Sequence, residues 1–289
     1  IIVSEYTDWL KINYNGRIAF VYKRYVDTSY EENKTEPVKK PDPDPTPINQ
    51  TGDYFYQRKD LAKVKLEPKK QIDVPSERKE KIAASTWNKY GGLIEEVSKE
   101  LKIEVESALA VLCVESGGNG FVNDRMIIRF ENHVFDMYWG KHNEKEFKDH
   151  FDYNRKDRRK NHKFRENKKD DWETCHKGQD MEWKVFNFAK KLAEKEAIFS
   201  ISMGAPQVMG FNYKSIGYST PQEMFKFFSA DIRYHLLALF DFCKYRPQRI
   251  TYLQKKDFYS FSVEYNGKAA PKQYEERIKE YYKIFKKLL

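Results

Sequence analysis

The chain has 289 residues, of which 40% are hydrophobic and 16% are aromatic. This composition is sufficient for a buried core and excludes a wholly disordered chain. No stretch approaches the roughly 18 consecutive apolar residues that a membrane-spanning helix needs. The formal net charge of +9 fits either an ordinary solvated surface or an anionic partner: nucleic acid, phospholipid headgroups or an acidic wall polymer.

The cysteines and the N-terminus exclude further classes. Cys113, Cys175 and Cys243 are odd in number and far apart, so neither a disulfide framework nor a zinc site is expected. The first ten residues lack the basic flank and the small-residue cleavage site of a signal peptide. Because the sequence begins without methionine, we expect a fragment or a processed product.

Residues 1–30 are predicted to form a β structure. Their apolar residues alternate around Asn15-Gly16, a pair that accepts the positive φ angles of a tight hairpin. The stretch WLKINYNGRIAFVYKRYV resembles the last strands of bacterial SH3-type wall-binding domains. A lone hairpin is marginally stable in water. We therefore expect either further strands upstream of Ile1 or another surface on which the hairpin docks.

The next segment, residues 31–50, is rich in proline and charged residues. Alternating Pro and Asp favours an extended, polyproline-like chain that buries little. The segment is predicted to be a semi-rigid spacer, so residues 51–289 are expected to form a separate domain.

The domain after the spacer is predicted to be mainly helical. Apolar residues recur there at three- and four-residue spacing, which is typical of amphipathic helices. The segments with this pattern are 90–101, with Gly91-Gly92 near its start, 108–114, 181–200, 221–244, either continuous or broken, and 272–289. Segment 108–114 is apolar on most sides, so it is expected to be the central helix.

Residues 141–171 are densely charged, with an excess of Lys and Arg. One interpretation is a solvated excursion on the surface. The other is a patch that contacts an anionic wall or a membrane.

Glu115 ends the most apolar helical segment and is followed by Gly117-Gly118. Apolar neighbours and the negative end of the helix dipole both disfavour its charged form, which would raise its pKa. A carboxyl that stays protonated near neutral pH suits general acid catalysis, and the glycines leave room for a bulky substrate. The alternative is a solvent-facing glutamate beside an ordinary glycine C-cap.

Glu131 is a second candidate carboxylate, and it follows an apolar, strand-like run. Two carboxylates in different surroundings are the usual equipment of a glycosidase. The alternative is a structural ion pair with Arg129. Arg129 and His133 are candidates for substrate contact, or have structural roles.

Two loops supply candidate substrate-binding residues. The segment SMGAPQVMGFNY is not a phosphate loop, because it lacks the GK[ST] ending. Its exposed backbone, the amide of Gln207 and the rings of Phe211 and Tyr213 suit a saccharide cleft. A Tyr-Asn-Gly turn contributes Tyr265 and Asn266.

Five segments together resemble the phage-type N-acetylmuramidase endolysins, a family of the lysozyme superfamily. In the order and spacing of that family, the chain carries AASTWNKYGGLIEEVSKEL, LAVLCVESGGNGF, MIIRFENHVF, SMGAPQVMGFNYKSIGY and YNGKAAPKQY, which span about residues 55–289. The resemblance implies that Glu115 is the catalytic acid and Glu131 a second functional carboxylate. It also places Gln207 beside the cleft and Tyr265 near the acid. Met203 and Pro206 depart from the family pattern, which puts the sugar contacts there in doubt.

The predicted fold is therefore mainly α: a lysozyme-like helical catalytic domain with a small β-hairpin region, preceded by an SH3-like β fragment and a proline-rich linker. The resemblance implies cleavage of the β-1,4 bond between N-acetylmuramic acid and N-acetylglucosamine in bacterial peptidoglycan, with no metal and no organic cofactor. It implies a phage-encoded protein that acts at the host cell wall or in the periplasm, for lysis or carried in the virion. The N-terminal fragment is then a candidate contact to the wall or to other virion or tail proteins.

Three alternatives remain open at this point. A lytic transglycosylase shares the fold and the single acid but leaves a 1,6-anhydro product. A structural or wall-binding virion component would keep the fold without the activity. Nucleic-acid binding agrees with the charge, but no specific binding motif supports it.

Overall fold

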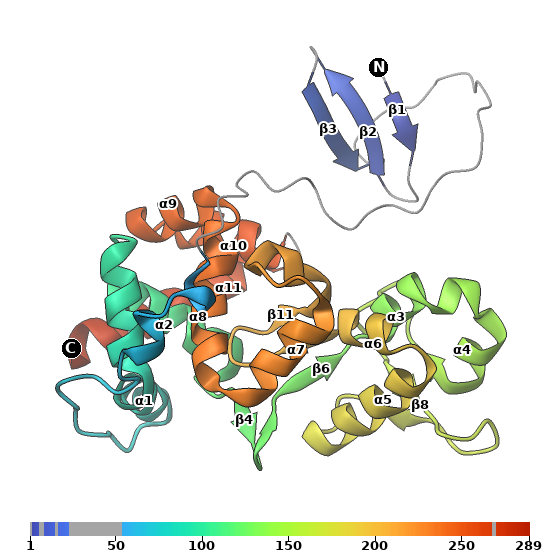
Figure 1. Ribbon diagram of the computed structural model, residues 1–289, viewed down its shortest axis with the longest axis horizontal. Coiled ribbons are helices and arrows are strands. Elements are labelled where there is room, and N and C mark those ends of the chain that lie inside the picture. The colour runs from blue at the N-terminus through green and yellow to red at the C-terminus, as the bar shows by residue number, and fades with distance from the viewer. Residues whose placement is uncertain (1, 6–8, 15–16, 23–53, 268–269) are drawn as a thin grey trace. The chain divides into compact units, whose positions relative to one another are not determined.

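The computed structural model describes residues 2–5, 9–14, 17–22, 54–267 and 270–289 (Figure 1). The chain divides into two compact units, residues 1–43 and residues 44–289, which are described separately. The predicted spacer at 31–50 lies outside the described residues. Among the described residues, no helix is long and apolar enough to span a membrane.

The first unit contains three antiparallel strands in the order β1-β2-β3. These are β1 (Ile2–Glu5), β2 (Trp9–Tyr14) and β3 (Arg17–Tyr22). Tyr14 at the end of β2 pairs with Arg17 at the start of β3, so the predicted hairpin is confirmed.

The second unit is mainly helical, as predicted (Figure 1). Its helices are α1 (Arg78–Glu100), α2 (Val105–Ser116), α3 (Asn132–Tyr138), α4 (Glu144–His150), α5 (Gln179–Leu192), α6 (Glu194–Phe199), α7 (Pro221–Ala230), α8 (Ile232–Lys244), α9 (Pro247–Lys255), α10 (Phe258–Asn266) and α11 (Pro271–Leu288). Short 3-10 helices cover Phe55–Gln57, Leu61–Lys63, Gly140–His142 and Gly210–Ile216. The strands are β4 (Phe121–Val122), β5 (Arg125–Met126), β6 (Ile128–Phe130), β7 (Phe151–Asp152), β8 (Lys163–Phe164), β9 (Glu173–Thr174), β10 (Ile201–Met203) and β11 (Val208–Met209).

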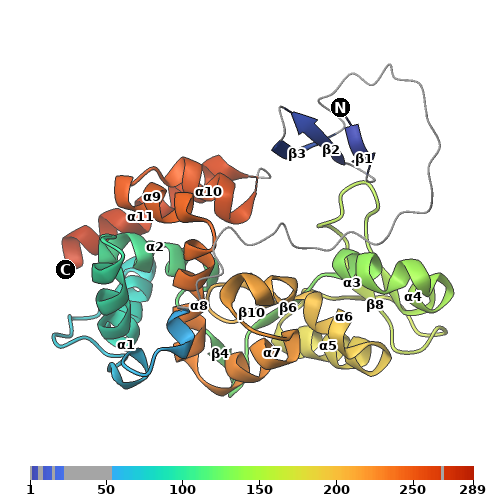
Figure 2. The ribbon, with the colours of Figure 1, turned by 45° about the horizontal axis from the view of Figure 1, so that its top comes forward.

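Two hydrophobic clusters form the core of this unit. The first surrounds α2 and includes residues of α1, α10 and α11, and the second surrounds β6 and β10 and includes residues of α3, α5 and α6. Figure 2 shows α1, α2 and α9–α11 on one side and α3–α6 on the other, with β6 and β10 between them. Helix α8 belongs to both clusters, because Leu236 packs in the first and Phe242 in the second.

Helix α2 is the central helix, as its composition predicted. Every residue from Ala108 to Val114 is buried, and the helix packs against α1 and α11. It ends at Gly117, whose φ of +62° is left-handed. Gly118 is also left-handed, and a Cβ there would lie 2.1 Å from Thr86 Oγ1. Glu115, at the end of this helix, is therefore followed by two positions, Gly117 and Gly118, that favour glycine over any residue with a side chain.

Helix α1 is longer than expected, and Gly91-Gly92 lie in its interior rather than near its start. Ala83, Ala84 and Trp87 extend its buried face toward the N-terminus. Gly92 is needed where the preceding chain crosses the helix, because a Cβ would lie 2.2 Å from the carbonyl oxygen of Glu67. Packing against that chain offsets the low helix propensity of glycine.

Two of the predicted helices are broken. The helix expected over 181–200 divides into α5 and α6 at Ala193, whose backbone is extended. The segment 221–244, expected to be either one continuous helix or a broken one, is broken into α7 and α8. The side chain of Asp231 caps α8 by accepting a hydrogen bond from the Arg233 amide at 2.8 Å, which favours a new helix start there.

A small antiparallel sheet, in the order β11-β10-β6, positions the loop residues. Ile201 pairs with Phe130, and Met203 pairs with both Ile128 and Val208. This register brings the residue after β6, Glu131, to the same region as the β10–β11 loop. Buried His235 fixes that loop, because its Nδ1 accepts a hydrogen bond from the Ala205 amide at 3.2 Å.

Asp241, on α8, holds the residues that precede α1. Its buried carboxylate accepts hydrogen bonds from the amides of Phe55, at 2.8 Å, and Tyr56, at 3.3 Å. We expect Asp241→Ala to lower the free energy of unfolding by about 2–4 kcal/mol, because two backbone donors lose a charged acceptor. Urea denaturation measures this loss, and Asp241→Asn, which keeps one acceptor, should lose less. Equal stability of the alanine variant and the wild type would contradict this role.

Candidate active site

A cleft of about 640 Å³ lies where the two hydrophobic clusters meet, and both candidate carboxylates line it. Glu115 comes from the end of α2 and Glu131 from the junction of β6 and α3. The other residues that line the cleft are Arg129, His133, Val134, Arg159, Ser202, Gln207, Met209, Phe211, Asn266, Gly267, Ala270, Gln273, Tyr274 and Arg277. Segments far apart in the sequence thus converge on one concave surface.

Glu115 is half-buried, and α10 and α11 supply its polar contacts. Its Oε1 accepts hydrogen bonds from the Tyr274 hydroxyl and from Asn266 Nδ2, the latter at 3.4 Å. Burial raises the pKa of Glu115 to about 7, against the opposing effects of Tyr274, Asn266 and the positive charge of Arg277. A large share of Glu115 is therefore protonated near neutral pH, as a general acid requires.

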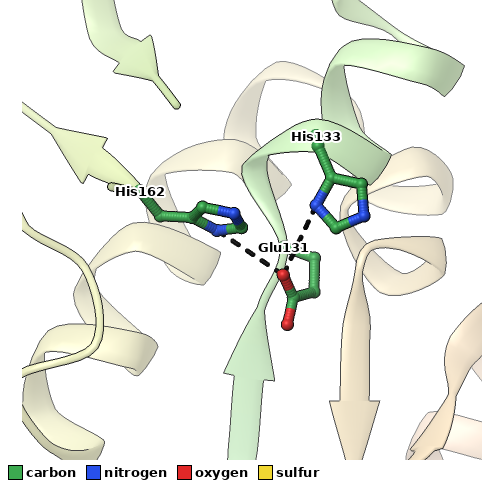
Figure 3. Close-up of side chains that lie close together, drawn as sticks. All are labelled: Glu131, His133 and His162. Carbon is green, nitrogen blue, oxygen red and sulfur yellow. Dashed lines mark ion pairs between the residues drawn. The ribbon is translucent and has the colours of Figure 1, made fainter. Parts of the chain in front are cut away.

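Glu131 has the opposite electrostatic surroundings. Arg129 Nε donates to its Oε1 at 2.9 Å. Oε2 lies 3.4 Å from His133 Nδ1 and 3.5 Å from His162 Nδ1 (Figure 3). Burial favours a higher pKa for Glu131, but His133, His162 and Arg129 together lower that pKa to about 2. Glu131 is therefore ionised under conditions in which Glu115 holds a proton.

Gln207, Phe211 and Asn266 line the cleft, the place that the sequence predicted for them. The amide of Gln207 is already hydrogen-bonded within its own loop. Its Nε2 donates to the Gly204 carbonyl at 2.7 Å and its Oε1 accepts from the Ser202 hydroxyl at 2.8 Å. These bonds fix the direction in which the Gln207 side chain faces the cleft.

Tyr213 and Tyr265 do not line the cleft. The ring of Tyr213 stacks on Phe199, with 6.0 Å between the ring centroids. The hydroxyl of Tyr265 donates to the Pro206 carbonyl at 3.3 Å, and its ring stacks on Phe261. Burial and the nearby charge of Glu115 raise the pKa of Tyr265, so Tyr265 lies near the acid without bonding to it.

Met203 and Pro206 are both buried, so neither residue changes the lining of the cleft. Met203 packs in the second hydrophobic cluster. The departure of these two residues from the family pattern therefore does not alter the walls of the cleft.

Tyr274, Arg277 and His162 also lie at this site and were not predicted from the sequence. The signal that points to Tyr274 is the YNGKAAPKQY segment, which it ends, one helical turn before Arg277. His162 lies in the charged 141–171 segment, which neither interpretation describes fully. That segment contributes buried core residues, Phe147, Phe151 and Phe164 among them, so it is partly an interior part of the domain.

The helical fold, with a glutamate at the end of its central helix, is shared with a solved phage endolysin. The chain is similar to the crystal structure of an endolysin from the Burkholderia phage AP3, with a TM-score of 0.53 and 21% sequence identity. The match covers 67% of this chain and 70% of that chain.

A family model of N-acetylmuramidases matches residues 104–286, and the chain belongs to this family. The matched range contains every residue of the cleft named above. The family supports a glycoside hydrolase that acts on peptidoglycan. No curated protein matches the chain in sequence. The family match does not extend to the first unit, and the SH3-like assignment there stays a prediction.

Proposed function

We propose that the chain hydrolyses the β-1,4 bond between N-acetylmuramic acid and N-acetylglucosamine in peptidoglycan. One observation carries the proposal: two carboxylates that line one cleft have pKa values displaced in opposite directions, to about 7 and to about 2. This difference supports Glu115 as the acid and Glu131 as the base, because one group holds a proton while the other is ionised.

Glu115 is the general acid of the proposed reaction. It donates its proton to the glycosidic oxygen while the bond from that oxygen to the anomeric carbon breaks. The Tyr274 hydroxyl and Asn266 bind Oε1 of Glu115, which leaves Oε2 to carry the proton toward the cleft. Tyr274 and Asn266 are therefore positioning residues for the acid.

Glu131 is the second carboxylate. As an anion it either accepts a proton from the attacking water or stabilises the positive charge that develops on the sugar ring. Arg129 holds one of its oxygens, so the carboxylate has a fixed orientation in the wall of the cleft. The hydroxyl of the attacking water forms the new bond to the anomeric carbon. The other proton of that water passes to Glu131 or to solvent, and Glu115 regains one proton, so both carboxylates return to their starting states.

Gln207, Asn266 and Phe211 are the proposed sugar contacts. Amide groups suit the hydroxyl and acetamido groups of the glycan, and an aromatic ring suits the apolar face of a sugar. Arg129, Arg159 and Arg277 also line the cleft, so it favours substrates that carry carboxylates, such as the lactyl and peptide groups of peptidoglycan.

The similarity to a phage endolysin supports a phage-encoded enzyme that acts at the host cell wall. The three-stranded first unit would tether the enzyme to the wall or to a virion component. A tether raises the local concentration of the catalytic unit near its substrate.

Product analysis tests the proposal. Purified peptidoglycan digested by the wild-type chain should release fragments with free reducing ends, detected by mass spectrometry after borohydride reduction. Fragments lighter by one water, which are 1,6-anhydro products, would instead identify a lytic transglycosylase. No released fragments from any peptidoglycan would identify a non-catalytic wall-binding protein.

A further inference from the structure

Glu131 forms an unusual cluster with two histidines. Its Oε2 and the Nδ1 atoms of His133 and His162 all lie within 4.8 Å of one another. Figure 3 shows both rings directing a nitrogen toward the same carboxylate oxygen. Glu131 Oε2 and His133 Nδ1 are buried without a hydrogen-bond partner among the described residues. Such unsatisfied buried atoms are rare in folded proteins and indicate a missing partner.

The hydrogen bonds of His162 settle which of its nitrogens carries the proton. Nε2 lies 2.7 Å from the carbonyl oxygen of Arg158, and a carbonyl only accepts, so Nε2 is the donor. Nδ1 accepts from the Asn132 amide at 3.4 Å. Nδ1 therefore carries no proton toward the carboxylate oxygen 3.5 Å away. Its one lone pair makes only the long contact to the Asn132 amide, which a bound cation would replace.

The separations of the two histidine nitrogens from Glu131 Oε2 match those between ligands of one metal ion. Two ligand atoms that each lie about 2.0–2.1 Å from a tetrahedral zinc are roughly 3.3–3.4 Å apart. The distances from Oε2 to the two nitrogens are 3.4 and 3.5 Å. We infer that Glu131, His133 and His162 bind a divalent transition-metal cation, with Zn²⁺ as the best fit.

The surroundings of the cluster also fit a metal site. Metal-binding histidines commonly donate their second nitrogen to a backbone carbonyl, as His162 does to Arg158. Arg129 binds the other oxygen of Glu131 and so leaves Oε2 available. His162 is fully buried, whereas the His133 side chain is 22% exposed. An ion would therefore enter the site from the side of His133.

The ligand set predicts which cations bind. Two imidazoles and one carboxylate suit Zn²⁺ and its first-row neighbours, whereas Mg²⁺ and Ca²⁺ prefer sites made of oxygen atoms. Three protein ligands leave a fourth position for water, the arrangement of catalytic rather than structural zinc sites. Because Glu131 and His133 line the cleft, that water would face the substrate. With Arg129 on Oε1 and the ion on Oε2, Glu131 would act through that water rather than as a free base.

Titration of the metal-free full-length chain with Zn²⁺ tests the site. Isothermal calorimetry should show one ion per chain, and Co²⁺ should give the visible absorption of a low-symmetry bound ion. His133→Ala should weaken Zn²⁺ binding by more than the roughly 10–100-fold that loss of an outer hydrogen-bond partner produces. The three cysteines are buried, so thiols do not compete for the ion.

Two matched variants serve as controls. His142→Ala removes an exposed histidine outside the cluster, and it should bind Zn²⁺ as the wild type does. Glu115→Gln should also bind normally, although the proposed function predicts that it is inactive. The metal site and the catalytic proposal can therefore fail separately.

Two results would overturn the inference. One is the absence of stoichiometric Zn²⁺ binding by the wild type. The other is unchanged affinity in both His133→Ala and Glu131→Gln, each with a native circular dichroism spectrum.

Discussion

Replacing Glu115 with Gln is expected to lower the rate of peptidoglycan hydrolysis by about 10²–10⁴-fold, the usual contribution of a general acid. Gln has nearly the same shape and can still accept the hydrogen bond from Tyr274. It has no proton to give to the leaving oxygen. Release of soluble fragments from purified peptidoglycan measures the loss.

The same substitution should stabilise the fold at alkaline pH. The native pKa of Glu115, about 7, lies above its ordinary value of 4.5, so the native chain holds an extra proton between these values. Stability then falls as pH rises across this window, by at most about 1.4 kcal/mol per pH unit. This penalty is the free-energy cost of ionising Glu115 in the folded chain. It is absent below about pH 4.5, where Glu115 is protonated in both states, and reaches its full size above about pH 7. Glu115→Gln avoids the penalty, so its melting temperature should exceed that of the wild type at pH 8 but not at pH 4.

Glu106→Gln is the matched control for both measurements. Glu106 lies in the first turn of the same helix and pairs with Lys286 at 3.1 Å. It should change neither activity nor the pH dependence of stability appreciably. A Glu115→Gln variant with wild-type activity would remove Glu115 from the mechanism, whatever its stability.

The activity of the wild type should fall as pH rises through about 7, because Glu115 then loses the proton that it must donate. The Tyr274 hydroxyl lowers the pKa of Glu115 by stabilising its anion. Tyr274→Phe removes that bond, so the alkaline limb of the kcat/KM profile should move to higher pH. Initial rates on a soluble glycan substrate across pH 5–9 locate the alkaline limb in the wild type and in Tyr274→Phe.

Tyr252→Phe provides a comparison for this experiment. Tyr252 lies on α9 and is not among the residues that line the cleft. Its loss should leave the alkaline limb in place. An alkaline limb that is the same in Tyr274→Phe and the wild type would show that another group controls it.

Local sequence was sufficient to predict the surroundings of Glu115. The apolar run around Leu112, the position of Glu115 at its end and the glycines that follow are all readable within a few residues. The raised pKa follows from these local features together with burial. Helical periodicity likewise predicted α11, because its buried face repeats regularly along the chain.

Contacts between distant segments were the part that sequence reasoning missed. Tyr274 binds Glu115 although the two residues are 159 positions apart. His162 lies beside Glu131 and belongs to a charged segment that was expected at the surface. Periodicity describes which face of an element is buried, but not which partner covers it. Tyr213 and Tyr265 show the same limit, since aromatic residues in a loop serve its packing as readily as its ligand.

The position of α8 has a consequence for the stereochemistry of the reaction. Retaining glycosidases hold their carboxyl groups about 5–5.5 Å apart, and inverting ones about 6.5–9.5 Å apart. Glu115 stands on the first hydrophobic cluster and Glu131 on the second, and α8 packs into both. We therefore expect substitutions at Leu236 or Phe242 to shift the separation of the two carboxylates, and with it the stereochemistry of the proposed reaction, although neither side chain is among those that line the cleft.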